Sequence, residues 1–141
     1  MPVDASAGAT ISATVQALLT TDRSLAPLGI QVLSAGEDQA VARMEIQTDM
    51  AKGQLIAHGG LIFTLADTAF ICACAKDGQP AVTTSASIVH LAPAHVGDVL
   101  TARAEVRHRI GRLAHCDVTV FSHREVVAEF RGSAIQVAAK Q

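Results

Sequence analysis

The sequence predicts an α+β fold in which an antiparallel sheet wraps around one long central helix. Residues 59–76 place apolar side chains on every side of a helical wheel, and residues 61–75 contain one charge and no Pro or Gly. This pattern is typical of a helix that is buried nearly all round. The segments on both sides favour β-structure, and a length of 141 residues fits one domain. A sheet curled around the helix would cover the apolar surfaces of both.

The N-terminal half is expected to form a short helix and a hairpin. Apolar residues at Ile11, Val15, Leu18 and Leu19 have the spacing of an amphipathic helix. Two alternating segments then flank a turn at residues 36–38. The predicted elements are a disordered segment at residues 1–9, a helix at 10–21, and strands at 28–33 and 39–48, with residues 10–141 forming a single domain.

Four strands are expected after the central helix, which the turn-forming residues 76–80 bring to an end. Within residues 99–110, strict alternation predicts that Arg107 and Arg109 face solvent and that Ile110 faces the core. The predicted strands cover residues 82–91, 99–110, 113–122 and 126–137.

Composition excludes several classes of function. Half of the residues are hydrophobic and 17% are charged, an apolar excess that predicts burial between subunits of a homo-oligomer. A formal charge of −2 without a Lys/Arg block argues against nucleic acid as a partner. No apolar run approaches 18 residues and no secretory signal is present, so we expect a cytoplasmic protein without a membrane segment.

Neither the cysteines nor the histidines have the spacing of a metal site. Cys72 and Cys74 would lie about 200° apart on a helix, where they cannot converge on one ion. The six histidines include no pair spaced for a helix or strand site. We therefore expect no metal, and we expect the two helix cysteines to act as small core residues.

The start of the central helix and its one acidic residue suggest chemistry. Gly59 and Gly60 leave the N–H groups of the helix start unshielded, which suits an oxygen that becomes negative as a carbonyl is attacked. Asp67 is the only charged residue within residues 61–75 and could act as general base or nucleophile. The alternative is structural: His58 and the glycines cap the helix, and Asp67 bonds to a neighbouring strand.

Gly59 and Asp67 cannot act on one carbonyl from the same helix. They are eight residues apart, or about 12 Å along the axis at about 1.5 Å per residue. Two helices packed antiparallel across a two-fold axis would place Gly59 of one chain beside Asp67 of the other. The spacing therefore predicts a homodimer with two shared sites.

The sequence resembles a known family through three runs: HGGLIFTLADTAF, LAPAHVGDVLTA and EFRGSAIQV. They are similar to the hotdog-fold thioesterases of the phenylacetic acid degradation type, over roughly residues 25–137. The resemblance implies hydrolysis of an aryl- or short-chain acyl-CoA, with Asp67 activating water or attacking the thioester. It also implies that the Gly59 N–H of the neighbouring subunit polarises the carbonyl, that His58 positions it, and that dimers assemble into a homotetramer. Coenzyme A is then part of the substrate, and no other cofactor is expected.

Further residues are predicted to line the site. By the resemblance, Thr68 and Thr83 lie beside the reacting group, and Lys52 stands where many relatives carry Asn. Lys52 would either lower the basicity of Asp67 or reach a CoA phosphate. The remaining expected substrate contacts are Gly60, Phe70, and, for the CoA phosphates, Arg107, Arg109 and Arg112.

Two other functions remain open from the sequence. Lys52 also fits a hotdog protein that binds acyl-CoA without hydrolysing it. A hotdog hydratase or dehydratase ranks lower, because the helix carries no second acidic residue for an acid/base pair.

Overall fold

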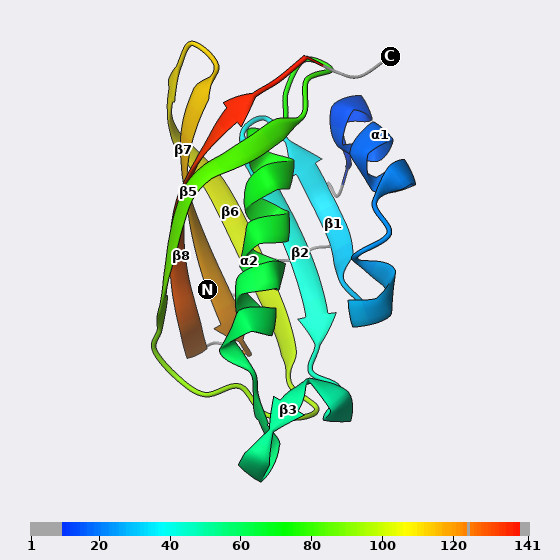
Figure 1. Cartoon of the computed structure of the whole chain (residues 1–141), viewed down its shortest axis with the longest axis vertical. Coiled ribbons are helices and arrows are strands. Elements are labelled where there is room, and N and C mark those ends of the chain that lie inside the picture. The colour runs from blue at the N-terminus through cyan, green and yellow to red at the C-terminus, as the bar shows by residue number, and fades with distance from the viewer. Residues whose placement is uncertain (1–9, 124, 139–141) are drawn as a thin grey trace.

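The structure is a curved antiparallel sheet that wraps around the central helix α2 (Gly59–Cys74), as Figure 1 shows. This computed structural model describes residues 10–123 and 125–138. The predicted α+β class with one central helix is confirmed. The segment 1–9, for which we expected disorder, lies outside the described residues.

The elements follow the predicted order closely. A short helix and a hairpin come first, α2 follows, and four long strands complete the chain. Two-residue strands and single helical turns occupy the connection before α2. The remaining bounds are α1 Ala13–Thr21, β1 Gln31–Gly36, β2 Gln39–Glu45, β3 Ala51–Lys52, β4 Ile56–Ala57, β5 Ala81–His90, β6 Val99–Ile110, β7 Leu113–Ser122 and β8 Glu125–Gln136, with 3₁₀ turns at Ala26–Leu28, Thr48–Met50 and Gly53–Leu55.

The main sheet has the strand order β1-β2-β6-β7-β8-β5, and every neighbouring pair is antiparallel. Its two edges differ. The segment that leads into α1 lies along β1. There the Ser12 N–H donates to the Ala35 carbonyl at 2.8 Å, and the Ala35 N–H donates to the Thr10 carbonyl at 2.9 Å. At the other edge, no strand of the described chain pairs with the outer side of β5. One edge is thus covered and the other is open.

The core lies between α2 and the concave face of the sheet. Leu65, Ala66 and Phe70 on α2 are fully buried, and the Phe70 ring packs against Phe130 of β8 with centroids 5.3 Å apart. A Cβ on Gly132 would lie 2.9 Å from the Phe70 ring, so this strand position requires glycine. Cys72 and Cys74 are core residues, as predicted, and burial raises the pKa of the Cys72 thiol to about 12.

A β-bulge corrects the prediction for the end of β6. The pairing of β6 with β7 shifts between Val106 and His108. Alternation is therefore reversed beyond the bulge: Ile110 is 71% exposed, whereas the Arg109 side chain turns inward and is 17% exposed. Strict alternation predicted the opposite orientation for both residues.

Several helix and strand ends also differ from the prediction: α1 begins three residues later than predicted, at Ala13, and β2 ends three residues earlier, at Glu45. Residues 28–33 were expected to be extended, but β1 begins only at Gln31. The 3₁₀ turn Ala26–Leu28 comes before it and is capped by Gly29, which has a φ of +68°. Helix α2 ends at Cys74, two residues early, because Ala75 is extended and Lys76 pairs with Gln79 in a turn. Among the described residues, no helix is long and apolar enough to cross a membrane.

Candidate active site

Asp67 lies in the middle of α2, half-buried, on the side next to the open strand β5. The Thr83 hydroxyl on β5 donates to Asp67 Oδ1 at 3.4 Å. Burial raises the pKa of Asp67 above its ordinary value, and the hydrogen bond from Thr83 opposes part of that shift. A carboxylate with a raised pKa is a stronger base than an ordinary one, which suits it to take a proton from water.

The start of α2 leaves one backbone donor free. His58 caps the helix: its Nδ1 accepts from the Gly60 N–H at 3.3 Å, and its carbonyl accepts from the Leu61 N–H at 3.0 Å. The Gly59 N–H has no hydrogen-bond partner within residues 10–123 and 125–138. This N–H points from the positive end of the helix dipole and can bind an oxygen with developing negative charge.

His90 packs on Gly59, a contact that the sequence did not suggest. A Cβ on Gly59 would lie 3.1 Å from His90 Nε2 and 3.2 Å from its Cε1. The glycine is therefore needed to admit the imidazole of its own chain, as well as for any approach of a substrate. His90 ends β5, and β5 runs back along α2 toward the helix start (Figure 1).

Two clefts flank the helix start, and Lys52 borders both. One, of about 370 Å³, is lined by Lys52, Gly59 and His90 together with apolar residues of the loops and α2. The other, of about 380 Å³, includes His58 and Gly60. Lys52 thus lies at the Gly59 end of the helix, and within one chain it is not among the groups that shift the pKa of Asp67.

The comparison with known proteins decides the family. The family model described as the thioesterase superfamily matches residues 55–129, which hold α2, the helix start, Asp67 and His90. The chain belongs to the thioesterase superfamily. The predicted enzyme class, a hydrolase of thioester bonds, is confirmed, together with the hotdog fold and the resemblance to the phenylacetic acid degradation type.

Individual relatives agree with this assignment. The acyl-coenzyme A thioesterase PaaI of Escherichia coli is 37% identical over 122 residues, covering 86% of this chain and 87% of the relative. The solved structure of the E. coli PaaI protein from the phenylacetic acid degradation operon has a TM-score of 0.86 at 35% identity and covers 90% of this chain and 93% of that one. The structure of the TT0310 protein from Thermus thermophilus has a TM-score of 0.78 at 33% identity and covers 82% and 98%.

Other predicted residues of this thioesterase lie along α2, with different surroundings. The Thr68 hydroxyl donates to the Thr64 carbonyl at 2.8 Å, one turn earlier on the helix, beside Asp67. Phe70 corrects an expectation: it was predicted to contact substrate, but it is fully buried against Phe130 and Gly132. Within one chain Phe70 therefore packs the core and presents no surface to a substrate.

The structure does not bring the three predicted arginines together. Arg109 Nε donates to Asp38 Oδ1 at 2.9 Å, and its Nη2 donates to the Cys74 carbonyl at 3.0 Å, so its guanidinium is engaged at the C-terminal end of α2. Arg112 is exposed in the turn between β6 and β7. Arg107 lines a separate cavity, and none of the three lines either cleft at the helix start.

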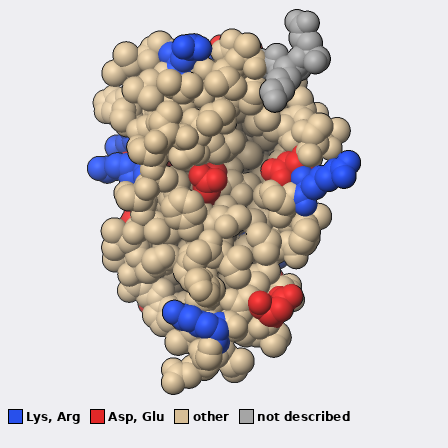
Figure 2. Space-filling view, viewed as in Figure 1, with Lys and Arg blue, Asp and Glu red and all other residues tan. Residues whose placement is uncertain are grey.

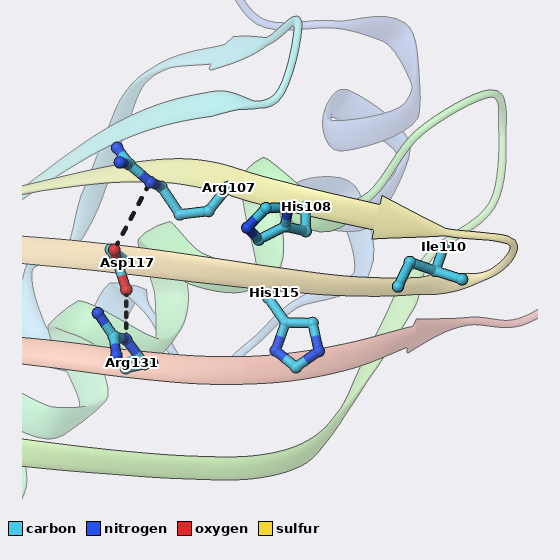
Figure 3. A pocket seen from close by; sticks show the side chains of 6 residues that line it. All are labelled: Arg107, His108, Ile110, His115, Asp117 and Arg131. Carbon is cyan, nitrogen blue, oxygen red and sulfur yellow. Dashed lines mark hydrogen bonds and ion pairs between the residues drawn. The ribbon is translucent and has the colours of Figure 1, made fainter.

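The cavity around Arg107 has a volume of about 630 Å³ and lies on the face of the sheet that points away from α2 (Figure 3). Asp117 there accepts from Arg131 Nε at 2.8 Å and lies 3.8 Å from Arg107 Nε. Glu105 also accepts from Arg107, at 3.0 Å. These carboxylates largely neutralise the arginines, so the cavity has little net attraction for a phosphate.

The described residues contain no cluster of three or more His, Cys, Asp or Glu side chains that could hold a metal ion. The groups near the helix start are a free N–H, an imidazole and an ammonium, and the carboxylate lies two turns further along α2. The groups at the helix start can polarise a carbonyl and Asp67 can act as a base, the two functions that thioester hydrolysis requires, but within one chain they lie about 12 Å apart along α2.

Proposed function

We propose that this thioesterase hydrolyses aryl- or short-chain acyl-CoA, such as phenylacetyl- or hydroxyphenylacetyl-CoA, to the free acid and CoA. The observation that carries the proposal is the pair formed by the unpartnered Gly59 N–H and the half-buried Asp67 of raised pKa. The named function of the E. coli relative, an acyl-coenzyme A thioesterase, supports CoA as the carrier. The solved structure of the E. coli PaaI protein is described as coming from the phenylacetic acid degradation operon, which supports an aryl acyl group.

In the proposed reaction Asp67 either takes a proton from water or attacks the thioester itself. The carbonyl oxygen becomes negative and is stabilised by the Gly59 N–H, while Thr83 holds the carboxylate. The tetrahedral intermediate collapses by breaking the C–S bond, and CoA leaves as the thiolate, which takes up the proton held by Asp67 or one from solvent. If Asp67 attacks directly, water then hydrolyses the resulting acyl anhydride, which releases the acid and frees the carboxylate. No further cofactor enters this scheme.

The site is proposed to be shared between two chains. About 12 Å separates Gly59 from Asp67 along α2, so one chain cannot present both to the same carbonyl. The open edge of β5 is where a second copy would add its own β5, and Val82, Val89 and Leu91 on and beside it are each more than half exposed. Figure 2 shows that most of the surface on the side of α2 and β5 is neither acidic nor basic. Such a dimer would assemble further into a tetramer.

The activity is tested by thiol release over a panel of phenylacetyl-, hydroxyphenylacetyl-, benzoyl- and aliphatic CoA thioesters. We expect the aryl or short-chain members to be hydrolysed fastest. Asp67→Asn should lower kcat by at least about 10²-fold, since it removes the base or nucleophile. Near-wild-type hydrolysis by Asp67→Asn would rule out this role. Tight binding of acyl-CoA by the wild-type protein without thiol release would instead indicate the non-catalytic function.

The two roles of Asp67 can be separated by repeated turnover in H₂¹⁸O with substrate in excess. If Asp67 is the nucleophile, an acyl anhydride forms on its side chain, and attack of water on the Asp67 carbonyl of that anhydride leaves ¹⁸O in the side chain after repeated turnovers. If Asp67 is a general base, all of the label enters the released acid. Peptide mass spectrometry across residues 59–74 measures the difference.

Sharing of the site is tested by mixing two inactive variants. In a heterodimer of Asp67→Asn and Gly59→Pro, one of the two sites combines an intact Asp67 with an intact Gly59. Random re-association of the two variants should therefore restore about a quarter of the wild-type activity, since half of the dimers are mixed and each has one intact site. No recovery after verified subunit exchange would show that the site does not have this composition.

A further inference from the structure

His90 lies at the helix start because β5 runs antiparallel to α2 and ends where α2 begins (Figure 1). Its side chain is on the concave side of the sheet, since its pairing partner on β8, Ala128, is fully buried. Within the described part of the chain, neither ring nitrogen of His90 has a hydrogen-bond partner. The imidazole therefore has free hydrogen-bonding capacity beside Gly59.

The distance between the two free nitrogens allows them to share one oxygen. His90 Nε2 lies 3.1 Å from the position of a Cβ on Gly59, and a Cβ is about 2.5 Å from its own backbone nitrogen. The Gly59 and Nε2 nitrogens are thus at most about 5.6 Å apart. Two donors that each hold the same acceptor at about 2.9 Å can be separated by up to about 5.8 Å.

Both nitrogens also border the same cleft of about 370 Å³. Its other walls are largely apolar, including Ile56, Ile62 and Pro93. Hydrogen bonds to a charged oxygen are stronger where water is excluded, so a substrate that fills this cleft would increase the effect of each donor.

We propose that His90 is a second oxyanion donor, and that its Nε2–H and the Gly59 N–H of the same chain bind the thioester oxygen together. This inference rests on the proposed function. His90 gives up no proton: its hydrogen bond shortens as attack on the carbonyl makes the oxygen negative, and lengthens again as the C–S bond breaks and the carbonyl re-forms. The residue contacts the reacting oxygen and acts chiefly in the transition state.

The test compares variants that separate hydrogen bonding from packing. His90→Phe keeps an aromatic ring against Gly59 but has no donor, and His90→Gln restores an N–H near the position of Nε2. We expect His90→Phe to lower kcat about 10- to 100-fold with KM changed less than about 3-fold, because one of two donors is lost. His90→Gln should recover part of that loss, and His95→Phe in the following loop should leave kcat unchanged.

The opposite pattern overturns the proposal. A kcat within about 2-fold of wild type in His90→Phe would assign His90 to packing alone, as would a Gln variant no better than Phe. Lys52 lines the same cleft, so Lys52→Met is included. If Lys52→Met shows the loss of kcat expected of His90→Phe, and His90→Phe does not, the second donor is the ammonium and the proposal is wrong.

A second readout does not depend on turnover. A ketone analogue of phenylacetyl-CoA, with a methylene in place of sulfur and ¹³C at the carbonyl, reports hydrogen bonding through the position of its infrared carbonyl band. Binding to wild type should shift the band to lower frequency, and His90→Phe should abolish about half of that shift. A band shift in His90→Phe equal to that in wild type overturns the role of His90. So does a failure of the wild-type protein to bind the analogue. If the wild-type protein releases no thiol from the thioesters but the band shifts follow the expected pattern in both proteins, only the proposed function is overturned.

Discussion

The two ends of α2 differ in whether the rest of the described chain supplies partners for their free backbone groups. At the C-terminal end, the carbonyls of Ala73 and Cys74 accept from Arg109, and the chain around them is buried. At the N-terminal end, the Gly59 N–H has no partner in the described chain and borders a cleft. Carbonyls at the C-terminal end are thus bonded within the chain, whereas a donor at the N-terminal end is available to a ligand. The first end should be important for stability, and the second for activity.

The largest expected effect is at the free N–H. Proline is favoured at the first position of a helix and has no N–H, so Gly59→Pro removes the donor while keeping the helix. We expect kcat to fall about 10²- to 10³-fold, the usual result of removing an oxyanion donor. Steady-state thiol release measures it.

The control for Gly59→Pro is Gly59→Ala, which keeps the N–H but introduces the same Cβ, 3.1 Å from His90 Nε2. It should cost less activity than proline, with the remaining loss due to displacement of His90. In Gly60→Ala the new Cβ meets His58 Nδ1 at an ordinary 3.6 Å, so this variant should be nearly neutral. Equal losses for proline and alanine at residue 59 would indicate that shape, rather than the donor, matters there.

The next effect is at the opposite end of the helix. Arg109→Met removes the bonds to Asp38 and to the Cys74 carbonyl, so we expect the free energy of unfolding to fall by about 2 to 3 kcal/mol. Urea denaturation measures this, and kcat of the folded protein should be unchanged. The exposed Arg112→Met is the matched control and should change stability by less than about 0.5 kcal/mol. A raised KM at unchanged stability would instead make Arg109 a substrate contact.

The smallest effect concerns Asp67, between the two ends. Because burial raises its pKa, the folded state favours the protonated carboxyl, and ionisation of Asp67 destabilises the fold as the pH rises through that raised pKa. Asp67→Asn should therefore raise Tm by about 1 to 3 °C at pH 7. The gain should disappear as the pH falls toward the ordinary value of 3.8.

Thermal melts at several pH values measure this dependence. The exposed Asp77→Asn is a suitable control, because Asn tolerates the positive φ of 55° at this turn position. It should show no comparable change. A drop in Tm for Asp67→Asn at pH 7 would mean that contacts of the carboxylate, such as the hydrogen bond from Thr83, outweigh the cost of its burial.

The sequence predicted features that depend on local pattern. The central helix is recognisable because its apolar residues surround it, and the turns after Ala35 and at Gly111 follow from Gly and acidic residues. The helix start and Asp67 stand out because glycine and a carboxylate are unusual in such a helix. Family membership then follows from the same residues.

The features that the sequence could not predict depend on pairing between distant segments. The bulge after Val106, which turns Arg109 inward, is set by the register of β6 on β7 and leaves no local signal. The contact of His90 with Gly59 needs the direction of β5 along α2. Phe70 was assigned to substrate because helix periodicity alone does not distinguish the side of α2 that packs on β8 from the side that carries Asp67 next to β5.

The distance along α2 between Gly59 and Asp67 has a kinetic consequence for a shared site. Each catalytic centre would require two polypeptides, so dissociation abolishes turnover without unfolding either one. At dilutions below the dimer dissociation constant, the observed rate should rise with the square of total enzyme, and only above it in direct proportion. Abundance in the cell would then regulate flux more steeply than it would for an enzyme that is active as a single chain.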